Sequence, residues 1–476
     1  MPMARRVDVS IDWRRYPFQL VPGDRRLQFP AAEGVHPDHE SDTWFIASQL
    51  GAATGRSLAF LTIFNKNRPG GSIVADFYTL ALFDLDTGAY GTYTDYDMPP
   101  ANLRPAARSA MRAGKPAEKP TNRTQPRPKL SAAEGHLAIR YDSNAGTATW
   151  TTCRDSDAEL LPYTYRVSLV GTDQTGQPMS LDLDVSPTRA PVPVGAAKYN
   201  GKIACFGQAD TYSYFHTGMA MTGTLRWGGV CEQVTGSAGH VDRQWFPKYA
   251  GGGGTGGDPR ARSHEWRTIN LDNGVDLSIW RQFDRTRNNA LRPFSGATTS
   301  YPGRLPECAE DVEVAVTSYV RWPDSVRPLL APLSSARFMP DRHRLTSATL
   351  QLDLTGEPLV AVPAHALPIE YMEGPYRYHG TLRGEPVSGF GFYERSLALY
   401  RDWELIDVLA AAVATLEPAN PELTNLVDRI RPLALSGRRG EARELAQAAA
   451  AALPADRAAG CGDVLAGLLE ALSVGE

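Results

Sequence analysis

The sequence is poor in cysteine, balanced in charge and free of long apolar runs. Its five cysteines are spread widely over 476 residues, and no two of them form a Cys-x-x-Cys pair. We therefore expect reduced, buried thiols rather than a disulfide framework or a zinc knuckle. The formal net charge is −4, from 49 basic and 53 acidic side chains. This balance gives no reason to expect nucleic acid or an anionic membrane as a partner.

Signals for targeting and for cofactors are also missing. Residues 1–20 contain arginines but no apolar stretch, and no run is long enough to cross a membrane, so we expect a cytoplasmic protein. Peripheral membrane association stays open. The glycine run at 251–257 lacks the Gly-Lys-Ser/Thr ending of a phosphate-binding loop, and there is no dinucleotide fingerprint or Gly-x-Ser-x-Gly elbow. The histidines in His36-Pro37-Asp38-His39-Glu40 do not have metal-ligand spacing. We therefore expect no cofactor and no metal.

Strand patterns dominate the chain from residue 40 to residue 400. Short β-branched and aromatic runs alternate with Gly, Asn and Asp turns. The clearest hairpin has Asp272-Asn273-Gly274 at its turn, because Asn-Gly readily adopts the positive φ angles of a tight turn. Many antiparallel strands without intervening helices predict barrels or sandwiches.

Two segments depart from this pattern. Residues 98–130 are rich in proline, alanine and basic side chains, which favours a solvated insertion over a lid above a pocket. From Leu397 onward the sequence is rich in Ala and Leu with helical periodicity, which predicts about four helices. These helices would form a bundle on the β body or the surface of a homodimer. We expect two β domains, residues 1–195 and 196–400, and an α-helical extension, residues 401–476.

The leading candidate for chemistry lies in a polar segment with a large aromatic ring. In a strand, His240, Asp242 and Gln244 would share one face, and Arg243 and Trp245 the other. An Asp that lines an apolar pocket has a raised pKa and can act as a general acid near neutral pH. An ion pair with Arg243 would instead lower the pKa of Asp242 and make it structural. On the residues alone, the structural role is the more common outcome.

Two further carboxylates, Glu373 and Glu394, have aromatic neighbours in the sequence, among them Tyr371 and Tyr393. Glycines such as Gly389 imply bends or a close approach of the backbone. The glutamates either take part in proton transfer or hold a strand end or a buried arginine, and both interpretations stay open.

Further aromatic side chains are candidates for lining a pocket. Tyr212-Ser213-Tyr214-Phe215-His216 precedes a strand that runs to Trp227. Aromatic residues in β proteins more often belong to the core, so the segment alone is a weak signal.

Five segments taken in order resemble the superfamily of carotenoid 1,2-hydratase (hydroxyneurosporene synthase) and AttH-like proteins. Relatives include kievitone hydratase-like proteins and lipocalin-like Diels–Alderases. The resemblance spans residues 35–400, with segments that begin at Asp42, Tyr212, Val234, His264 and Tyr371. His240 and Arg243 stand where the family usually has Trp and His, which favours another reaction over carotenoid hydration.

The resemblance implies a mainly β protein with two lipocalin-like antiparallel β-barrel or sandwich domains and an apolar pocket in or between them. It implies a cofactor-independent cyclase, isomerase or hydratase of secondary metabolism that acts on a hydrophobic polyene or isoprenoid-like substrate. The reaction would use alkene protonation or substrate templating. The candidate catalytic residues are Asp242, Glu373, Glu394 and His240, and the candidate substrate-binding residues are Trp44, Tyr214, His216, Trp245, Trp266 and Tyr393.

A non-catalytic carrier is the alternative, because a lipocalin-like pocket can simply hold a hydrophobic ligand. Asp242 discriminates between the two functions. An Asp242 that lines an enclosed aromatic pocket favours catalysis, whereas an outward Asp242 paired with Arg243 favours the carrier.

Overall fold

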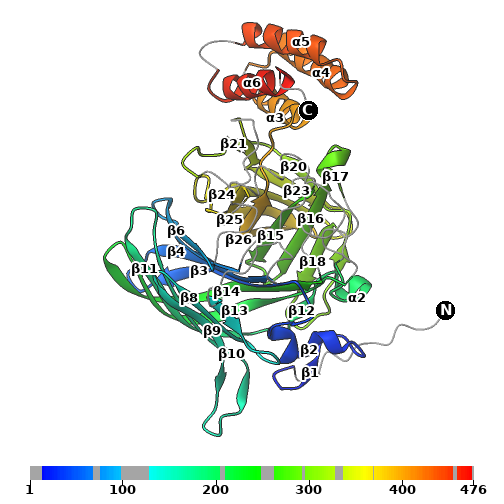
Figure 1. Cartoon of the computed structure of the whole chain (residues 1–476). Helices are drawn as coiled ribbons and strands as arrows, with labels where there is room; N and C mark the ends of the chain where they lie inside the picture. The colour runs from blue at the N-terminus through cyan, green and yellow to red at the C-terminus, as the bar shows by residue number, and fades with distance from the viewer. Residues whose placement is uncertain are drawn as a thin grey trace, which may run out of the picture.

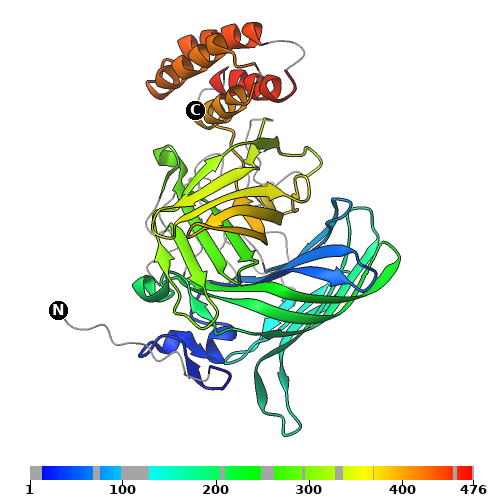
Figure 2. The same ribbon diagram turned by 180° about the vertical axis from the view of Figure 1, so that it is seen from behind.

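The structure is a computed structural model. It describes residues 13–67, 76–97, 128–203, 210–247, 262–291, 295–326, 336–367, 369–416, 418–453 and 458–473. Most of the basic insertion expected at 98–130 and the glycine run at 251–257 lie outside these residues. Within them, the chain is mainly β, as predicted, with two curved antiparallel sheets followed by helices (Figures 1 and 2).

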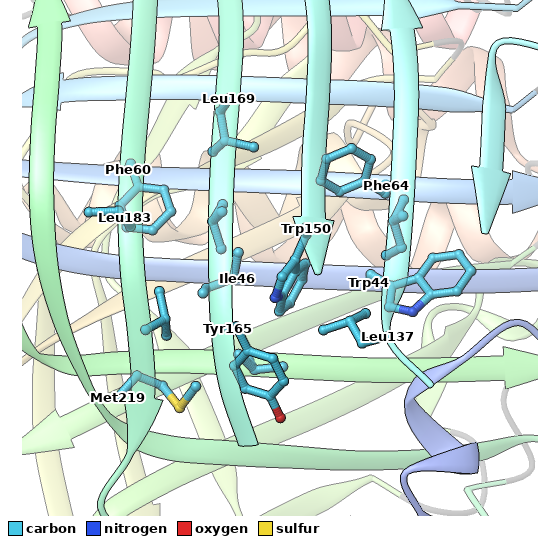
Figure 3. Close-up of a cluster of buried hydrophobic side chains, with 14 of the residues drawn as sticks. Trp44, Ile46, Phe60, Phe64, Leu137, Trp150, Tyr165, Leu169, Leu183 and Met219 are labelled. Atoms are coloured by element: carbon cyan, nitrogen blue, oxygen red, sulfur yellow. The ribbon is translucent and has the colours of Figure 1, made fainter. Parts of the chain in front are cut away.

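The first sheet has 12 strands in the order β6-β5-β4-β3-β14-β13-β11-β10-β9-β8-β7, with β12 paired to β13. Its strands are β3 (Ser41–Ala52), β4 (Ser57–Asn67), β5 (Phe77–Asp84), β6 (Ala89–Tyr96), β7 (Leu130–Ala132), β8 (Ala138–Ser143), β9 (Gly146–Arg154), β10 (Leu160–Thr172), β11 (Pro178–Pro187), β12 (Val192–Pro193), β13 (Tyr212–Trp227) and β14 (Val230–Phe246). The sheet curls so that its two halves enclose a core that contains Trp44, Trp150 and Tyr165 (Figure 3). A small N-terminal hairpin, β1 (Phe18–Gln19) with β2 (Gln28–Phe29), and a 3-10 turn, η2 (Ala31–Glu33), pack beside this core.

The second sheet has 10 strands in the order β19-β18-β16-β15-β26-β25-β24-β23-β20, with β17 paired to β16. Its strands are β15 (Arg262–Leu271), β16 (Asp276–Asp284), β17 (Ala290–Leu291), β18 (Gly296–Ser300), β19 (Cys308–Ala309), β20 (Glu313–Val316), β23 (His343–Ser347), β24 (Leu352–Pro358), β25 (Tyr371–Leu382) and β26 (Glu385–Ser396). The predicted hairpin is confirmed, because β15 and β16 pair across the turn and Gly274 has a φ of 84°. A short pair, β21 (Tyr319–Arg321) with β22 (Phe338–Pro340), lies near the helical end.

The sheets do not divide the chain at residue 195. Residues 212–246, which we placed in the second β domain, supply β13 and β14 to the first sheet. The strand β14 pairs with β3, whose sequence lies almost 200 residues earlier, so this membership depends on a long-range pairing. The second sheet takes its strands from Arg262 onward.

Four helices follow the second sheet and have a hydrophobic core of their own. They are α3 (Asp402–Ala414), α4 (Pro421–Leu435), α5 (Arg439–Ala452) and α6 (Ala458–Ser473), in agreement with the prediction. The bundle sits at the end of the second sheet that is far from the first sheet (Figure 1). No helix in the described part of the chain is long and apolar enough to cross a membrane.

Three apolar clusters fill the β body. One lies inside the first sheet and one inside the second sheet. The third lies between the sheets and takes side chains from both, such as Phe45 and Phe215 of the first and Trp266 and Phe392 of the second. The central strand β14 therefore faces the interior of the first sheet on one side and the second sheet on the other.

Candidate functional site

Side chains of β14 alternate between the two sides of the first sheet, as a strand requires. Val241 and Trp245 belong to the core inside the first sheet. Asp242 and His240 face the other way, toward the second sheet, where His240 stacks on Phe215 with ring centroids 5.3 Å apart. The predicted division of this segment between two faces is therefore what the structure shows.

Arg243 forms a buried ion pair with Asp42, and not with Asp242. Its Nη2 donates to Asp42 Oδ1 at 2.6 Å, and His36 Nδ1 lies 2.8 Å from the same oxygen. Burial alone would raise the pKa of Asp42, but the positive charge of Arg243 and the hydrogen bond from His36 more than offset it and lower that pKa. The guanidinium of Arg243 also lies over the ring of Trp44, 4.0 Å from its centroid.

A small cavity opens inside the first sheet beside this pair. Its volume is about 10 Å³, which is about the space of one water molecule and far below the range of roughly 300–1,000 Å³ that is usual for small-molecule sites. The walls are mostly aromatic and include three of the predicted substrate-binding residues, and Figure 3 shows Trp44, Leu137, Trp150 and Tyr165 gathered on this side. The lining residues are Glu33, Trp44, Leu137, Trp150, Tyr165, Tyr214, His216, Val241 and Arg243. Trp245 packs beside Tyr214, with ring centroids 6.3 Å apart.

Glu33 is the carboxyl group of this cavity. It ends the turn η2, and its side chain accepts hydrogen bonds from the hydroxyls of Tyr16, at 2.8 Å, and Tyr165. Burial raises the pKa of Glu33 to about 7, although the two tyrosine hydrogen bonds and Arg243 oppose the shift. Glu33 can therefore hold and release a proton near neutral pH.

Sequence reasoning missed Glu33. Its neighbours in the sequence are Ala32 and Gly34, and its two tyrosine partners lie 17 and 132 residues away. The hydrogen bond from the indole of Trp44 to the backbone carbonyl of Glu33, at 2.8 Å, fixes the turn against β3. No local sequence pattern predicts the two tyrosine hydrogen bonds or the hydrogen bond from Trp44.

His216 reaches the cavity as a neutral ring. Burial lowers its pKa to about 3, opposed by the hydrogen bond between its Nε2 and the carbonyl of Arg189 at 2.7 Å. Since a carbonyl only accepts, Nε2 carries the proton and Nδ1 is left as an acceptor.

The three predicted catalytic carboxyls meet on the opposite face of β14, between the sheets. Asp242 accepts hydrogen bonds from Ser213, at 3.2 Å, and from Gln244, and burial raises the pKa of Asp242 to about 7. Glu373 and Glu394 are direct neighbours on β25 and β26. Burial, and then the charge of Glu394, raise the pKa of Glu373, and the charge of Glu394 also contributes to the shift at Asp242.

A tyrosine and a histidine contact these glutamates. The hydroxyl of Tyr371 donates to Glu373 Oε2 at 2.8 Å, and His264 Nε2 lies 2.5 Å from Glu394 Oε1. Within the described ranges, no group of three His, Cys, Asp or Glu side chains has the geometry of a metal site.

The remaining predicted site residues do not line the cavity. His240 lies 2.8 Å from the hydroxyl of Thr268, and burial lowers its pKa to about 3. Trp266 donates its indole N–H to Ser278 at 3.0 Å and packs between the sheets. Tyr393 points into the second sheet, where its hydroxyl donates to Glu265 at 3.0 Å.

Comparison with known families agrees with the sequence resemblance. Residues 108–395 match the model of the AttH-like family, which is more than half of the chain. The chain belongs to the AttH-like family. No curated protein matches the sequence of this AttH-like chain significantly.

Solved structures share the fold of this AttH-like chain. An AttH protein from Nitrosomonas europaea aligns with a TM-score of 0.52 and 18% identity, covering 80% of this chain and 99% of its own. Kievitone hydratase from Nectria haematococca aligns with a TM-score of 0.51 and 14% identity, covering 78% and 92%. CghA is more distant, with a TM-score of 0.42 and 12% identity over 76% and 89% of the two chains.

Proposed function

We propose that this protein is a cytoplasmic, cofactor-independent cyclase, isomerase or hydratase of secondary metabolism. Its substrate is a hydrophobic polyene or isoprenoid-like molecule, which binds at the aromatic cavity of the first sheet. The cavity is only large enough for about one water molecule, so its lining side chains must move apart to admit the substrate. Glu33 transfers the proton, a role that we assigned to Asp242 from the sequence. One observation carries the proposal: a buried carboxyl with a pKa of about 7 stands in the wall of an aromatic cavity.

Proton transfer from Glu33 accounts for each reaction without a redox step. The π electrons of an alkene form a C–H bond with the proton of Glu33, and the adjacent carbon becomes cationic. In hydration, water bonds to this carbon and returns a proton to the Glu33 carboxylate. In cyclisation, a second double bond forms a C–C bond with the cationic carbon and the positive charge moves to its far carbon. In cyclisation and in isomerisation, the final cation loses a neighbouring proton to the Glu33 carboxylate, which leaves a new double bond.

Rings in the cavity wall and beside it differ in whether a cation already covers them. Trp44 and Trp245 already hold the Arg243 guanidinium against their faces, at 4.0 and 5.3 Å from the ring centroids. Trp150 and Tyr214 are left to stabilise a substrate cation, a contact worth about 2 kcal/mol when desolvated. The charge of Arg243 is balanced by Asp42, so it does not oppose the cation as a free charge would.

One N–H donor of Arg243 makes no hydrogen bond in the described part of the chain. Its Nε is buried and has no hydrogen-bond partner in the described structure. An oxygen on the substrate would satisfy this N–H and orient the molecule against Glu33. The hydratase among proteins of the same fold supports the same reaction class.

Asp242 is the second candidate for the proton donor, because its pKa is also raised to about 7 and it lies with Glu373 and Glu394. A carrier is the alternative function. It is favoured by the two tyrosine hydrogen bonds, which give Glu33 a structural role that needs no chemistry.

Native mass spectrometry and organic extraction of the protein from its producing host test the proposal. The wild type is compared with Glu33→Gln, with Asp242→Asn and with Asp353→Asn, whose carboxylate is exposed and paired with Arg344. We expect the Glu33→Gln protein to hold an unreacted compound that differs from the wild-type ligand, with the Asp353→Asn protein unchanged. A changed ligand in the Asp242→Asn protein alone would assign the proton transfer to Asp242. The same ligand on all four proteins contradicts both acid mechanisms and favours the carrier or substrate templating without an acid.

A further inference from the structure

Three arginines surround one glutamate on the inner face of the second sheet. Glu265 on β15 has Arg281 of β16 and Arg395 of β26 as its direct cross-strand neighbours. Arg267 follows two residues later on the same face of β15. Arg281 Nη1 donates to Glu265 Oε1 at 2.7 Å, Arg267 Nη2 to Oε2 at 3.2 Å, and Arg395 Nη1 lies 3.8 Å from Oε2. We refer to Arg267, Arg281 and Arg395 as the arginine cluster.

Among the residues that the structure describes, no group accepts from several donors of the arginine cluster. Arg267 Nη1, Arg281 Nε and Arg395 Nε are buried without a hydrogen-bond partner among the described residues. Arg395 donates no hydrogen bond in that part of the chain, and its Nη1 lies 3.8 Å from the shared Glu265. Its guanidinium lies 4.7 Å from the ring centroid of Phe283. A guanidinium offers five donors in a planar fork that matches an oxoanion.

The charges of the arginine cluster are not balanced locally. In the described structure, Glu265 is the carboxylate that the three guanidinium groups share, which leaves two positive charges in excess. The neighbouring glutamates Glu370 and Glu404 are paired with other arginines. His343, which accepts from Arg267 Nε at 3.1 Å, is neutral, because burial and then Arg267 lower its pKa to about 3.

We propose that the arginine cluster is a binding site for an oxoanion, either the carboxylate of an organic acid or a phosphate group. Buried charges without partners are costly, so an excess of two guanidinium groups points to a missing anion. The side chain of Arg281 is 15% exposed, whereas those of Arg267 and Arg395 are 0% and 4% exposed. An anion therefore enters beside Arg281 and is held by the unused donors. This site is separate from the Glu33 cavity and does not depend on the proposed reaction.

Calorimetric titration of the full chain at pH 7 tests the site with two probes, inorganic phosphate and octanoate, with ionic strength held constant by sodium chloride. We expect saturable binding of at least one probe to the wild type. Arg395→Met keeps the aliphatic volume and removes the guanidinium, so binding weakens at least about tenfold, the loss of one charge-assisted hydrogen bond. Arg344→Met, an exposed arginine of the same sheet, leaves binding unchanged.

Stability without the probes gives a second readout. Arg395→Met removes a charge that donates no hydrogen bond in the described structure, so the variant unfolds at the wild-type denaturant concentration or above it. Arg395→Lys keeps the positive charge but loses the planar set of guanidinium donors. It replaces Arg395→Met in the binding test if the Met variant does not fold. Octanoate binding alone identifies a carboxylate with an apolar tail, and phosphate binding alone a small oxoanion. The site is refuted by the absence of saturable binding of both probes to the wild type, or by equal binding to wild type and Arg395 variants.

Discussion

Asp242 and Arg243 are adjacent on β14, but their side chains leave the first sheet on opposite faces. Arg243 pairs with Asp42 inside the sheet, and Asp242 accepts from Ser213 and Gln244 toward the second sheet. Arg243 therefore shifts the pKa of Asp242 less than burial, the hydrogen bonds from Gln244 and Ser213, or Glu394 do. The sheet separates two polar sites that neighbouring residues of one strand create.

The ion pair of Asp42 with Arg243 is buried on both sides, with side-chain exposures of 2% and 1%. Asp42→Asn leaves the guanidinium of Arg243 without its carboxylate, so we expect the free energy of unfolding to fall by about 3–5 kcal/mol. Urea denaturation measures it. Asp353→Asn breaks an exposed pair on the second sheet and serves as the control. Equal losses in the free energy of unfolding of the two variants would show that burial does not make the Asp42–Arg243 pair more costly to break.

The titration of Asp242 should make the free energy of unfolding depend on pH. Comparison of the wild type with Asp242→Asn isolates this contribution. Burial raises the pKa of Asp242 to about 7 in the folded protein, against about 3.9 when unfolded. Between these values the folded state binds more protons, so the free energy of unfolding of the wild type falls as pH rises from 4 to 7. Asp242→Asn does not titrate at this position. We expect it to gain up to about 4 kcal/mol over the wild type across this window.

Denaturation of both proteins at several pH values between 4 and 8 gives this difference. All other titrating groups are common to the two proteins, so their contributions largely cancel. Parallel stability curves for the two proteins would show that Asp242 titrates as an exposed aspartate does, and would remove it as a proton donor.

The sequence predicted the local features of this site well. A strand has a period of two, so the separation of His240 and Asp242 from Arg243 and Trp245 follows from the pattern alone. The turn at Gly274 follows equally, because Asn-Gly tolerates the positive φ that the hairpin requires.

Features that depend on distant contacts were not predictable from the sequence. The carboxyl of Glu33 is protonatable near neutral pH because the fold buries it, and its partner Tyr165 comes from β10, 132 residues away. The addition of β14 to the first sheet depends on its pairing with β3. The meeting of Asp242 with Glu373 and Glu394 depends on how the two sheets pack, which no local pattern encodes.

The helical bundle is attached through a buried ion pair of Glu404 with Arg285. Arg285 donates to both carboxylate oxygens, at 2.9 and 2.7 Å, and the backbone N–H groups of Tyr400 and Arg401 donate to Oε2 at 3.1 Å. Glu404→Ala should cost about 3–5 kcal/mol and speed hydrogen exchange in α3, because it leaves Arg285 buried without its partner. Glu441→Ala, in an exposed pair of α5, is the control and should leave exchange in α3 unchanged. Unchanged exchange in α3 of the Glu404 variant would show that the bundle is held by its apolar contacts.

Tyr165 tunes the proposed proton donor. Its hydroxyl donates to the Glu33 carboxylate and holds the pKa of Glu33 below the value that burial alone would produce. Tyr165→Phe should therefore raise the pKa of Glu33 by about 1–2 units, since a hydrogen bond to a charged group contributes about 1.5–3 kcal/mol. The infrared band of the protonated carboxyl, assigned by its loss in Glu33→Gln, follows this titration.

Tyr214→Phe is the matched control for Tyr165→Phe. Tyr214 lines the same cavity but makes no hydrogen bond to Glu33 in the described structure. Its variant should leave the carboxyl titration close to that of the wild type. A midpoint that stays near 7 or falls in Tyr165→Phe would refute the hydrogen bond as the tuning contact. If Glu33 donates the proton in the reaction, the alkaline limit of activity moves upward with the carboxyl midpoint, because only the protonated form reacts.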